Sequence, residues 1–510
     1  MDRTLYSLRN ILTIWGSQLL VLACSFVVRI VFARYLAQDY LGLQTLFSSV
    51  LSMLSLVELG IGSAIIYQLY RPLAEHDTET VKSIMRLYKR AYITIGVLVA
   101  IIGCILAPNI RLIIEGAPDI PYLELYFLLF VLNTSVAYFF SYKGSLVTAD
   151  QRNYVVTIID CISQMLMSIL QLCVLVFTQN YVLFLSCMVL CTLLKNLMIV
   201  FMSNRMYPYL KEKNIAPLQK EVTARIKKNV FALLIHKISS MVKYPLNTVL
   251  VSFFAGLKTV AIYGNYILII NTIMSLIDRA YGAVIASLGN IGVTETNERQ
   301  NQVFEVAFFV NATLTGFATV CLLPLFNPII YLMFGESYVF PLDVTLLIVI
   351  WFYTQSIRSA LVAYESAYGI FWELKWKSVA EMAFLLITAP IMTYFFGIQG
   401  LLVANIVLQI LISTFVEGSI LFKYGLHSSM KPFLKHLGQY TIAIASMSMA
   451  AFFISSLLPS DPIIQIVVMI PICCTFLILF LFLFRKSYGF TEGSRVMKNV
   501  LSMVRKKKAD

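Results

Sequence analysis

Charged residues are scarce in this chain of 510 residues. Asp, Glu, Lys and Arg together make up 13% of it, whereas hydrophobic residues make up 59%, and the mean hydropathy is +0.82. Soluble globular domains carry about 25% charged residues. The shortage argues against a soluble domain, and the long apolar runs predict an all-α polytopic membrane protein.

Residues suited to chemistry are also few. The sequence has four histidines, no Walker A motif, no metal-ligand cluster and no nucleophile–base pair. We therefore predict that the protein is not an enzyme and needs no cofactor or metal. All nine cysteines fall inside apolar runs, so no disulfide framework is expected.

Fourteen apolar segments are long enough to cross a membrane, since about 20 helical residues span roughly 30 Å of hydrocarbon. The first is too long for a signal-peptide core and is predicted to be retained. The connections are short, so no soluble domain is inserted. The segments lie near residues 11–33, 41–69, 91–108, 121–142, 154–177, 181–203, 230–254, 260–286, 302–324, 342–363, 378–396, 399–422, 438–458 and 462–484.

Lysine and arginine are abundant in every second connection between spans and scarce in the others. With the N-terminus inside, cytoplasmic segments hold 30 of the 39 Lys and Arg residues, whereas outer loops hold only Arg34, Arg111 and Lys258. Cytoplasmic loops are enriched in these residues, so both termini are predicted to be cytoplasmic. The net charge of +13 reflects this bias and attraction to anionic lipid, and it gives no indication of nucleic-acid binding.

Polar side chains follow helical spacing in five of the spans. Residues three or four positions apart share a helix face, so each set forms a stripe suited to a water-filled cavity. The stripe of the seventh span places a lysine near mid-membrane, where charge is costly. The stripes are Gln18, Ser25 and Arg29; Asp160, Gln164, Ser168 and Gln171; His236, Ser240, Lys243 and Asn247; Asn271, Ser275, Asp278 and Gly282; and Asn405, Gln409 and Ser413.

The cations inside the spans have a plainer interpretation as well. The side chains of Lys195, Arg29 and Arg358 lie close enough to a membrane face to reach the headgroups. Lys243 has the farthest to reach, which favours a function for it. Arg279 follows Asp278 directly, and an ion pair between them would make Arg279 structural.

The acidic residues inside the spans leave two interpretations open. Glu58, Glu381 and Glu417 either bond neighbouring helices or carry protons. Glu58 and Asp278 are therefore candidates for a coupling role or a structural one.

A weak internal repeat relates the two halves of the chain. The segments YLAQDYLGLQTLF (35–47) and FAGLKTVAIYGNY (254–266) each leave one span through a short turn and enter the next. Their offset of 219 residues places spans one and two over spans seven and eight. Such repeats are common in secondary transporters, whose substrate sites lie between the halves.

Several segments resemble one transporter family, in the expected order. They are FARYLAQDYLGLQTLF, VELGIGSAIIY, GLKTVAIYGNY, MFGESYVFPLDVTLLIVI and FGIQGLLVANIVLQI. The chain resembles the polysaccharide-biosynthesis flippases, the Wzx-type branch of the multidrug/oligosaccharidyl-lipid/polysaccharide (MOP) superfamily, over nearly its whole length.

The resemblance implies two six-helix lobes around a central cavity and two further C-terminal helices. It implies domains at residues 1–203 and 230–422, a basic cytoplasmic linker at 204–229, and C-terminal helices with a basic tail at 423–510. It also implies a bacterial inner-membrane protein that moves oligosaccharides on undecaprenyl pyrophosphate to the outer leaflet for capsule, exopolysaccharide or O-antigen (lipopolysaccharide) export. Its partners would be the lipid-linked substrate, membrane lipid and a polymerase or export machinery.

The resemblance and the polar stripes together suggest a cationic cavity that receives the pyrophosphate. A diphosphate cannot cross bare hydrocarbon unless fixed donors and positive charge replace its water. Related lipid II flippases use arginines in helices one, two and eight, whereas helix two has no mid-span arginine here, which argues against lipid II as substrate. The expected substrate-binding residues are Arg29, His236, Lys243, Asn247 and Arg279.

Two other functions are compatible with many membrane spans. A multidrug and toxin extrusion (MATE) antiporter needs an acidic site for its cation, but the charges embedded in spans one and seven are positive. A glycan polymerase or ligase typically has a large or acidic outer loop, but the first outer loop offers only Asp39.

Overall fold

The computed structural model describes residues 20–55, 61–114, 120–150, 152–212, 220–282, 288, 291–292, 294–370 and 372–495. Within these ranges the chain forms helices joined by short turns and contains no β-strand. It divides into two compact units, residues 1–261 and residues 262–510. The protein is an all-α polytopic membrane protein, as the sequence predicts. The finer domain limits within each half stay a prediction.

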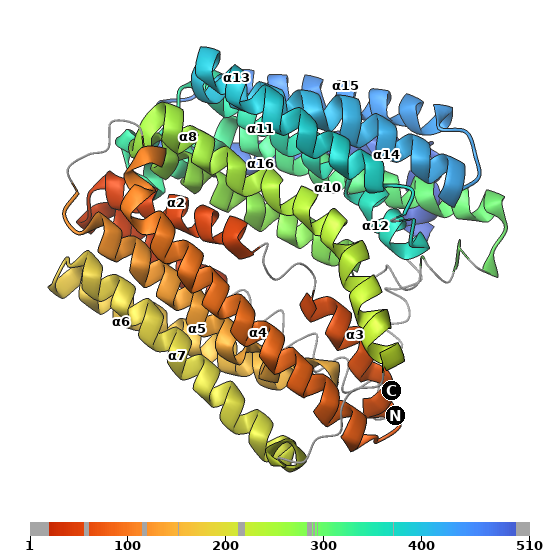
Figure 1. The fold of residues 1–510 in the computed structure, drawn as a ribbon. Helices are drawn as coiled ribbons and strands as arrows, with labels where there is room; N and C mark the ends of the chain where they lie inside the picture. The colour runs from red at the N-terminus through yellow and green to blue at the C-terminus, as the bar shows by residue number, and fades with distance from the viewer. Residues whose placement is uncertain are drawn as a thin grey trace, which may run out of the picture. The chain divides into compact units, whose positions relative to one another are not determined.

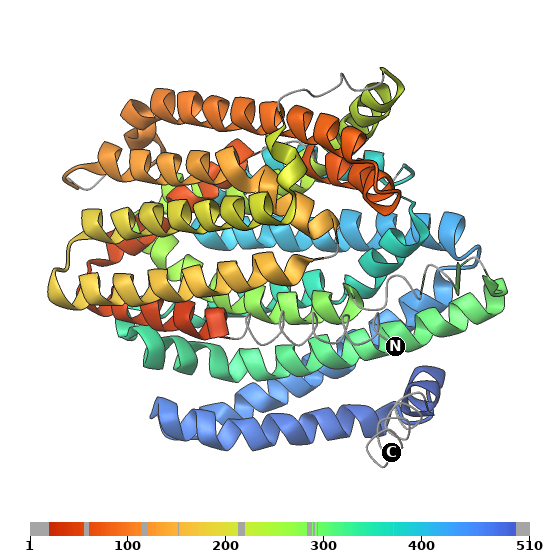
Figure 2. The same ribbon diagram turned by 90° about the horizontal axis from the view of Figure 1, so that it is seen from below.

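The first unit contains long helices that lie alongside one another. A helix covers residues 20–35, and α4, α5, α6 and α7 pack in sequence-neighbouring pairs, with α5 also against α7 (Figures 1 and 2). The helix bounds are α2 Gln38–Leu54, α3 Ile61–Ala74, α4 Thr78–Leu106, η2 Ala107–Ile113, α5 Leu123–Ala149, α6 Asn153–Phe177, α7 Tyr181–Met206, η3 Pro208–Lys211 and α8 Lys220–Gly282, whose last part belongs to the second unit.

The second unit is built around α10, against which α11, α15 and α16 pack. Two short segments, η5 and η6, have π-helical geometry and flank α14. The bounds are α10 Asn297–Phe334, η4 Glu336–Tyr338, α11 Leu342–Ser356, α12 Ser359–Tyr368, α13 Lys375–Leu408, η5 Gln409–Thr414, α14 Phe415–Ile420, η6 Leu421–Gly425, α15 Lys431–Ser456 and α16 Pro462–Leu483.

Ten helices among the described residues are long and apolar enough to cross a membrane. Two of them contain a residue with non-helical geometry, Gly256 in α8 (φ 76°) and Gly397 in α13 (φ 58°). Only glycine adopts such positive φ values readily. Both glycines lie where the sequence predicts one span to end and the next to begin, so each of these two helices covers two predicted spans.

The predicted topology leads to a labelling experiment. In a cysteine-free background, single cysteines at Asn180 and Ser460 should react with an impermeant thiol reagent added outside the cell. Cysteines at Asn214 and Ser429 should react only after permeabilisation, because the alternation of Lys and Arg places these loops inside. External labelling at position 214 would contradict the fourteen-span topology.

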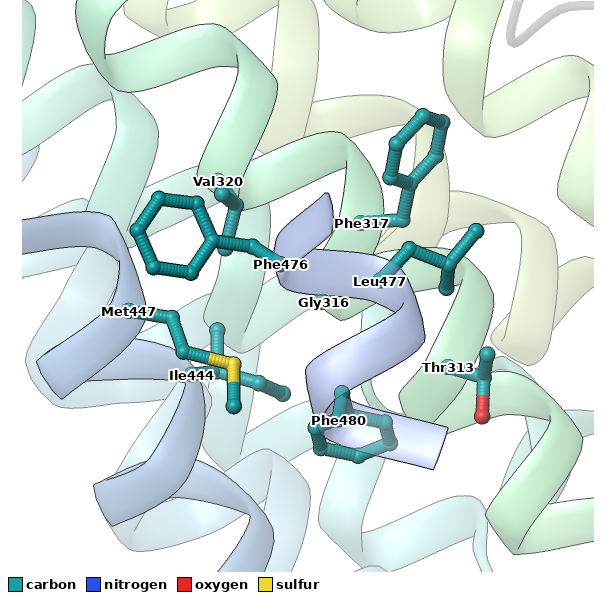
Figure 3. Close-up of a pocket in the computed structure, with 9 residues that line it drawn as sticks. All are labelled: Thr313, Gly316, Phe317, Val320, Ile444, Met447, Phe476, Leu477 and Phe480. Atoms are coloured by element: carbon teal, nitrogen blue, oxygen red, sulfur yellow. The ribbon is translucent and has the colours of Figure 1, made fainter. Parts of the chain in front are cut away.

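The two C-terminal helices α15 and α16 pack onto α10 around Gly316. Figure 3 shows Ile444, Met447 and Phe480 beside this glycine, around a cavity of about 10 Å³. That volume is about the minimum for one water molecule. An added Cβ at Gly316 would lie 2.7 Å from Ile444. These residues therefore form a tightly packed helix contact rather than a ligand site.

A close helix contact joins the two repeated segments within the first unit. A Cβ built on Gly42 of α2 would lie 2.2 Å from the carbonyl oxygen of Leu257 in α8. Small residues allow membrane helices to approach at the backbone. A residue without a side chain is thus needed at Gly42, because the backbone of the second repeated segment at Leu257 leaves no room for a Cβ.

Substitution of this glycine should destabilise the protein. We expect Gly42→Leu to lower the stability by about 1–3 kcal/mol or more, since overpacking shifts backbone and side chains. The measure is the amount of monodisperse protein in detergent after heating. Gly438→Leu is the control, because a Cβ there meets nothing within 4 Å. Equal losses in both variants would contradict the close contact.

A buried polar network connects two of the family-like segments in the second unit. Tyr266 of α8 donates its hydroxyl proton to Asn327 Oδ1 over 2.6 Å and accepts the backbone N–H of Phe340 over 3.0 Å. Asn327 also accepts from the Thr345 hydroxyl (2.9 Å). The network holds the turn between α10 and α11 in place. The residues that the two family-like segments contribute to it therefore have a structural role.

Candidate functional site

Arg29 and Asn247, two of the predicted substrate-binding residues, lie in the first unit. The Arg29 side chain is partly exposed, and its Nη2 lies 3.4 Å from the Thr45 hydroxyl of α2. Asn247 is only 2% exposed in α8. Arg29 thus contacts a neighbouring helix. Its role in substrate binding stays a prediction.

Three predicted residues fall outside what the structure describes. Glu58 lies in an undescribed segment, and the side chains of His236 and Lys243 are not described although their backbone belongs to α8. Their roles therefore stay predictions from the sequence.

Asp278 and Arg279 lie in the second unit, near the end of α8. The Asp278 carboxylate accepts a hydrogen bond from the Ser359 hydroxyl of α12 (3.2 Å). No ion pair links Asp278 to Arg279 among the described side chains. The pairing that would have made Arg279 structural is absent, and its guanidinium is partly exposed.

The predicted polar stripe of the fifth span meets a cation of the sixth. Lys195 Nζ in α7 lies 3.1 Å from Asp160 Oδ1 in α6. Both side chains are partly exposed, at 27% and 48%. Lys195 therefore has an anionic partner on a neighbouring helix. Its reach to the headgroups stays a prediction.

A group of five charged residues is buried inside the second unit, and we call it the buried charge cluster. Glu417, at its centre, is 0% exposed, and the other four are at most 9% exposed. The residues come from α12 and its N-cap, α13 and α14. The buried charge cluster consists of Arg358, Glu365, Lys377, Glu381 and Glu417.

Two cations contact the Glu417 carboxylate, one at each oxygen. The guanidinium of Arg358 donates to Glu417 Oε2 from Nη2 and, over 2.8 Å, from Nε. Lys377 Nζ lies 3.1 Å from Glu417 Oε1. Arg358 is 5% exposed and does not reach the headgroups, so the expectation that it extends to the membrane face is wrong. The reason is that a buried carboxylate provides a better partner.

The polar stripe predicted for the twelfth span completes this site. Gln409 accepts from Arg358 Nη1 and donates to Gln355 of α11. Ser413 donates its hydroxyl proton to Glu381, whose Oε1 lies 3.8 Å from Lys377 Nζ. Glu381 and Glu417 therefore do bond neighbouring helices, as one of the two sequence-based interpretations holds.

The helix that carries Glu417 is irregular on both sides of it. Gln409 and Ser413 belong to the π-helical segment η5, and η6 follows α14 with the same geometry. Such segments often occur at functional sites. Ionisable residues in membrane spans are also rare, and by default they indicate function. The buried charge cluster is therefore the candidate site that the described side chains support best.

Sequence patterns could have revealed only part of this cluster. Lys377 and Glu381 are four residues apart on one helix, and Gln409 and Ser413 form a recognisable stripe. The predicted span limits, however, leave Lys377 in a cytoplasmic connection, and no sequence pattern marks Glu365. The contacts of Glu417 with Lys377 and Arg358 join residues 40 and 59 positions apart, and no local pattern predicts them.

A model of the family described as polysaccharide biosynthesis protein matches residues 7–286 of the sequence. The matched region is more than half of the chain. The chain belongs to the polysaccharide biosynthesis protein family. No curated protein matches the sequence significantly.

Solved transporters share the fold of this family member at low sequence identity. The lipid II flippase MurJ, in an inward closed conformation, is similar with a TM-score of 0.69 and 12% identity over 93% of this chain and 99% of that one. An inward-facing MATE-family multidrug resistance transporter of the MOP superfamily gives 0.60 and 13% over 78% and 94%. A mutant of the Vibrio cholerae MATE transporter VcmN gives 0.56 and 16% over 83% and 98%. The chain therefore shares the fold of these transporters, as the sequence resemblance implied.

Proposed function

We propose that the protein is a flippase that moves oligosaccharide repeat units on undecaprenyl pyrophosphate from the inner to the outer leaflet. The observation that carries this proposal is the match to the polysaccharide biosynthesis family over residues 7–286. The shared fold with a lipid flippase supports it. The membrane would be the bacterial inner membrane, and the exported units would then enter polysaccharide assembly by a polymerase or export machinery.

The physical task is to carry a diphosphate and its sugars past the hydrocarbon. Arg29 and Arg279 offer partly exposed guanidinium groups, which bind phosphate oxygens in a bidentate way. Lys243 is proposed as a third cation from the sequence alone. The membrane potential favours outward movement of an anion by about 2.3 kcal/mol per charge per 100 mV. The substrate is moved without covalent change, so the protein would not act as an enzyme.

Drug export is the second candidate, because two of the similar structures are MATE transporters. It requires an acidic group that binds an organic cation. In the second unit, Glu417 and Glu381 already contact Arg358 or Lys377. These two carboxylates are therefore not available to a cationic drug, which weakens this candidate.

Reconstitution in liposomes tests the proposal against this alternative. Protein-containing liposomes should expose a labelled undecaprenyl-pyrophosphate oligosaccharide from the inner leaflet to an impermeant glycosidase, and protein-free liposomes should not. The same proteoliposomes should not move a fluorescent quaternary ammonium dye. Dye movement without glycan exposure would overturn the flippase proposal in favour of drug export.

A further inference from the structure

An apolar groove lies between α6 and α7 in the first unit. The two helices pack side by side (Figures 1 and 2), and the groove has a volume of about 620 Å³. Ile158 lines one wall, and Leu197 and Phe201 line the other. These side chains are 40%, 46% and 66% exposed. Dispersion contacts are lost wherever a surface has no partner atoms, so the groove suits a hydrocarbon chain of the surrounding membrane.

Helix α5 supports both walls of the groove from behind. A Cβ built on Gly144 of α5 would lie 3.5 Å from Ile199 of α7 and 3.9 Å from Val156 of α6, which are ordinary contact distances. Leu197 and Phe201 stand two residues from Ile199, on the opposite side of their helix. The groove is therefore formed by the faces of α6 and α7 that point away from α5.

The length of the groove matches one leaflet of a bilayer. Leu194, Met198 and Phe201 line it and follow helical spacing, and the exposed Arg205 continues the same face. Arg205 follows Leu194 by 11 positions, which corresponds to roughly 16 Å of helix, about half of the roughly 30 Å of hydrocarbon. The alternation of Lys and Arg predicts that the Arg205 end lies at the inner face, so we expect the groove to lie in the inner leaflet.

Two arginines lie at the end of the groove that is predicted to be cytoplasmic. Arg205 belongs to the last turn of α7, and Arg152, whose side chain is 53% exposed, is the N-cap of α6. Asp150 joins the two helix ends, because it pairs with Arg152 Nε over 3.2 Å and accepts the Tyr207 hydroxyl proton over 2.7 Å. One carboxylate leaves one of the two positive charges unbalanced. A phosphate group would balance it, since guanidinium groups bind phosphate oxygens in a bidentate way.

We propose that this groove binds an anionic phospholipid of the inner leaflet. One acyl chain lies between α6 and α7, and the phosphate lies at Arg205 and Arg152. The undecaprenyl chain of the proposed substrate is much longer than one leaflet, so the length of the groove favours an ordinary phospholipid. Binding of this lipid requires no flipping and is independent of the proposed function.

Native mass spectrometry of the purified protein tests the groove. The protein in detergent is titrated with phosphatidylglycerol, and the retained lipid is counted at each concentration. Leu197→Trp puts a large side chain into the groove and should abolish the tightest binding event. Leu190→Trp is the matched control, because Leu190 is 51% exposed on the same helix but does not line the groove. If Leu197→Trp does not fold, Ile158→Trp fills the groove from the other wall. A folded groove variant that retains lipid as Leu190→Trp does would overturn the site.

The preference for an anionic headgroup is tested with a second lipid. The wild type should prefer phosphatidylglycerol to phosphatidylcholine with the same acyl chains. Arg205→Gln should reduce this preference by about fivefold, the factor that one arginine near an anionic lipid contributes. Arg90→Gln changes an exposed arginine of α4, outside the groove, and should keep the wild-type preference. No preference in the wild type, or the same loss in both arginine variants, would contradict an anionic-lipid site.

Competition separates this lipid from the proposed substrate. Undecaprenyl phosphate added at the same concentration should leave the phosphatidylglycerol bound. Displacement at equal concentration would assign the groove to the polyprenyl lipid and overturn the proposal. A protein that binds the phospholipid as expected and flips no glycan would refute the proposed function and leave this site intact.

Discussion

Arg358→Gln should lower the stability of the folded protein by about 3–5 kcal/mol, the usual cost of removing one partner of a buried ion pair. Glu417, at 0% exposure, would keep its charge and lose the guanidinium that donates to it twice. The loss should be visible as a lower midpoint of unfolding in a denaturing detergent, measured by tryptophan fluorescence or gel mobility.

An exposed ion pair is the appropriate control for this variant. Arg111 and Glu124 pair over 3.2 Å with both side chains 44% exposed, and Arg111→Gln should cost at most about 1 kcal/mol. The double variant Arg358→Gln/Glu417→Gln should recover part of the loss, since the unpaired charge is removed with its partner. If Arg358→Gln costs no more than Arg111→Gln, the buried charge cluster is not assembled as described.

Lys243→Gln should reduce transport by about ten- to a hundredfold while leaving the protein folded. A charge-assisted hydrogen bond to the pyrophosphate is worth roughly 1.5–3 kcal/mol, and removing a lone cation from the membrane relieves a desolvation cost. Lys243→Arg should retain part of the activity, because charge and donors persist although the two groups differ in shape. The measurement is the initial rate of glycan exposure per folded molecule.

A cation outside the proposed cavity separates a local effect from the loss of net charge. Lys258 is exposed in α8, and Lys258→Gln should flip substrate at the wild-type rate. If Lys243→Gln instead yields less folded protein with normal activity per molecule, Lys243 is structural. Unchanged yield and unchanged activity would remove the centre of the proposed anion site.

Much of the fold follows from patterns that act locally. The scarcity of charge and the length of the apolar runs predict membrane helices. Hydrocarbon offers no water to the backbone, and a helix pairs its own N–H and C=O groups. Even the breaks in α8 and α13 coincide with turns that the sequence places between spans, since Gly256 and Gly397 permit positive φ. Gly42 lies in one of the two repeated segments, but the need for glycine there comes from the carbonyl oxygen of Leu257 on another helix.

The buried charge cluster was harder to predict because its contacts are long-range. An isolated arginine in a span suggests either a headgroup contact or a ligand, and the sequence near Arg358 does not identify Glu417 as its partner. The stripe of Gln409 and Ser413 correctly indicated a polar face, but a stripe does not say which charges face it. Pairing of this kind becomes visible only once the helices are packed.

The most direct test of the flippase account compares two lipids that carry the same glycan. One bears it on undecaprenyl pyrophosphate and the other on a neutral lipid without phosphate, and both are placed in the inner leaflet of liposomes containing the purified protein. Recognition of the pyrophosphate by Arg29, Lys243 and Arg279 predicts rapid exposure of the first lipid to external glycosidase and exposure of the second at the protein-free rate. Equal, protein-dependent exposure of both lipids would contradict an anion-binding cavity as the basis of transport.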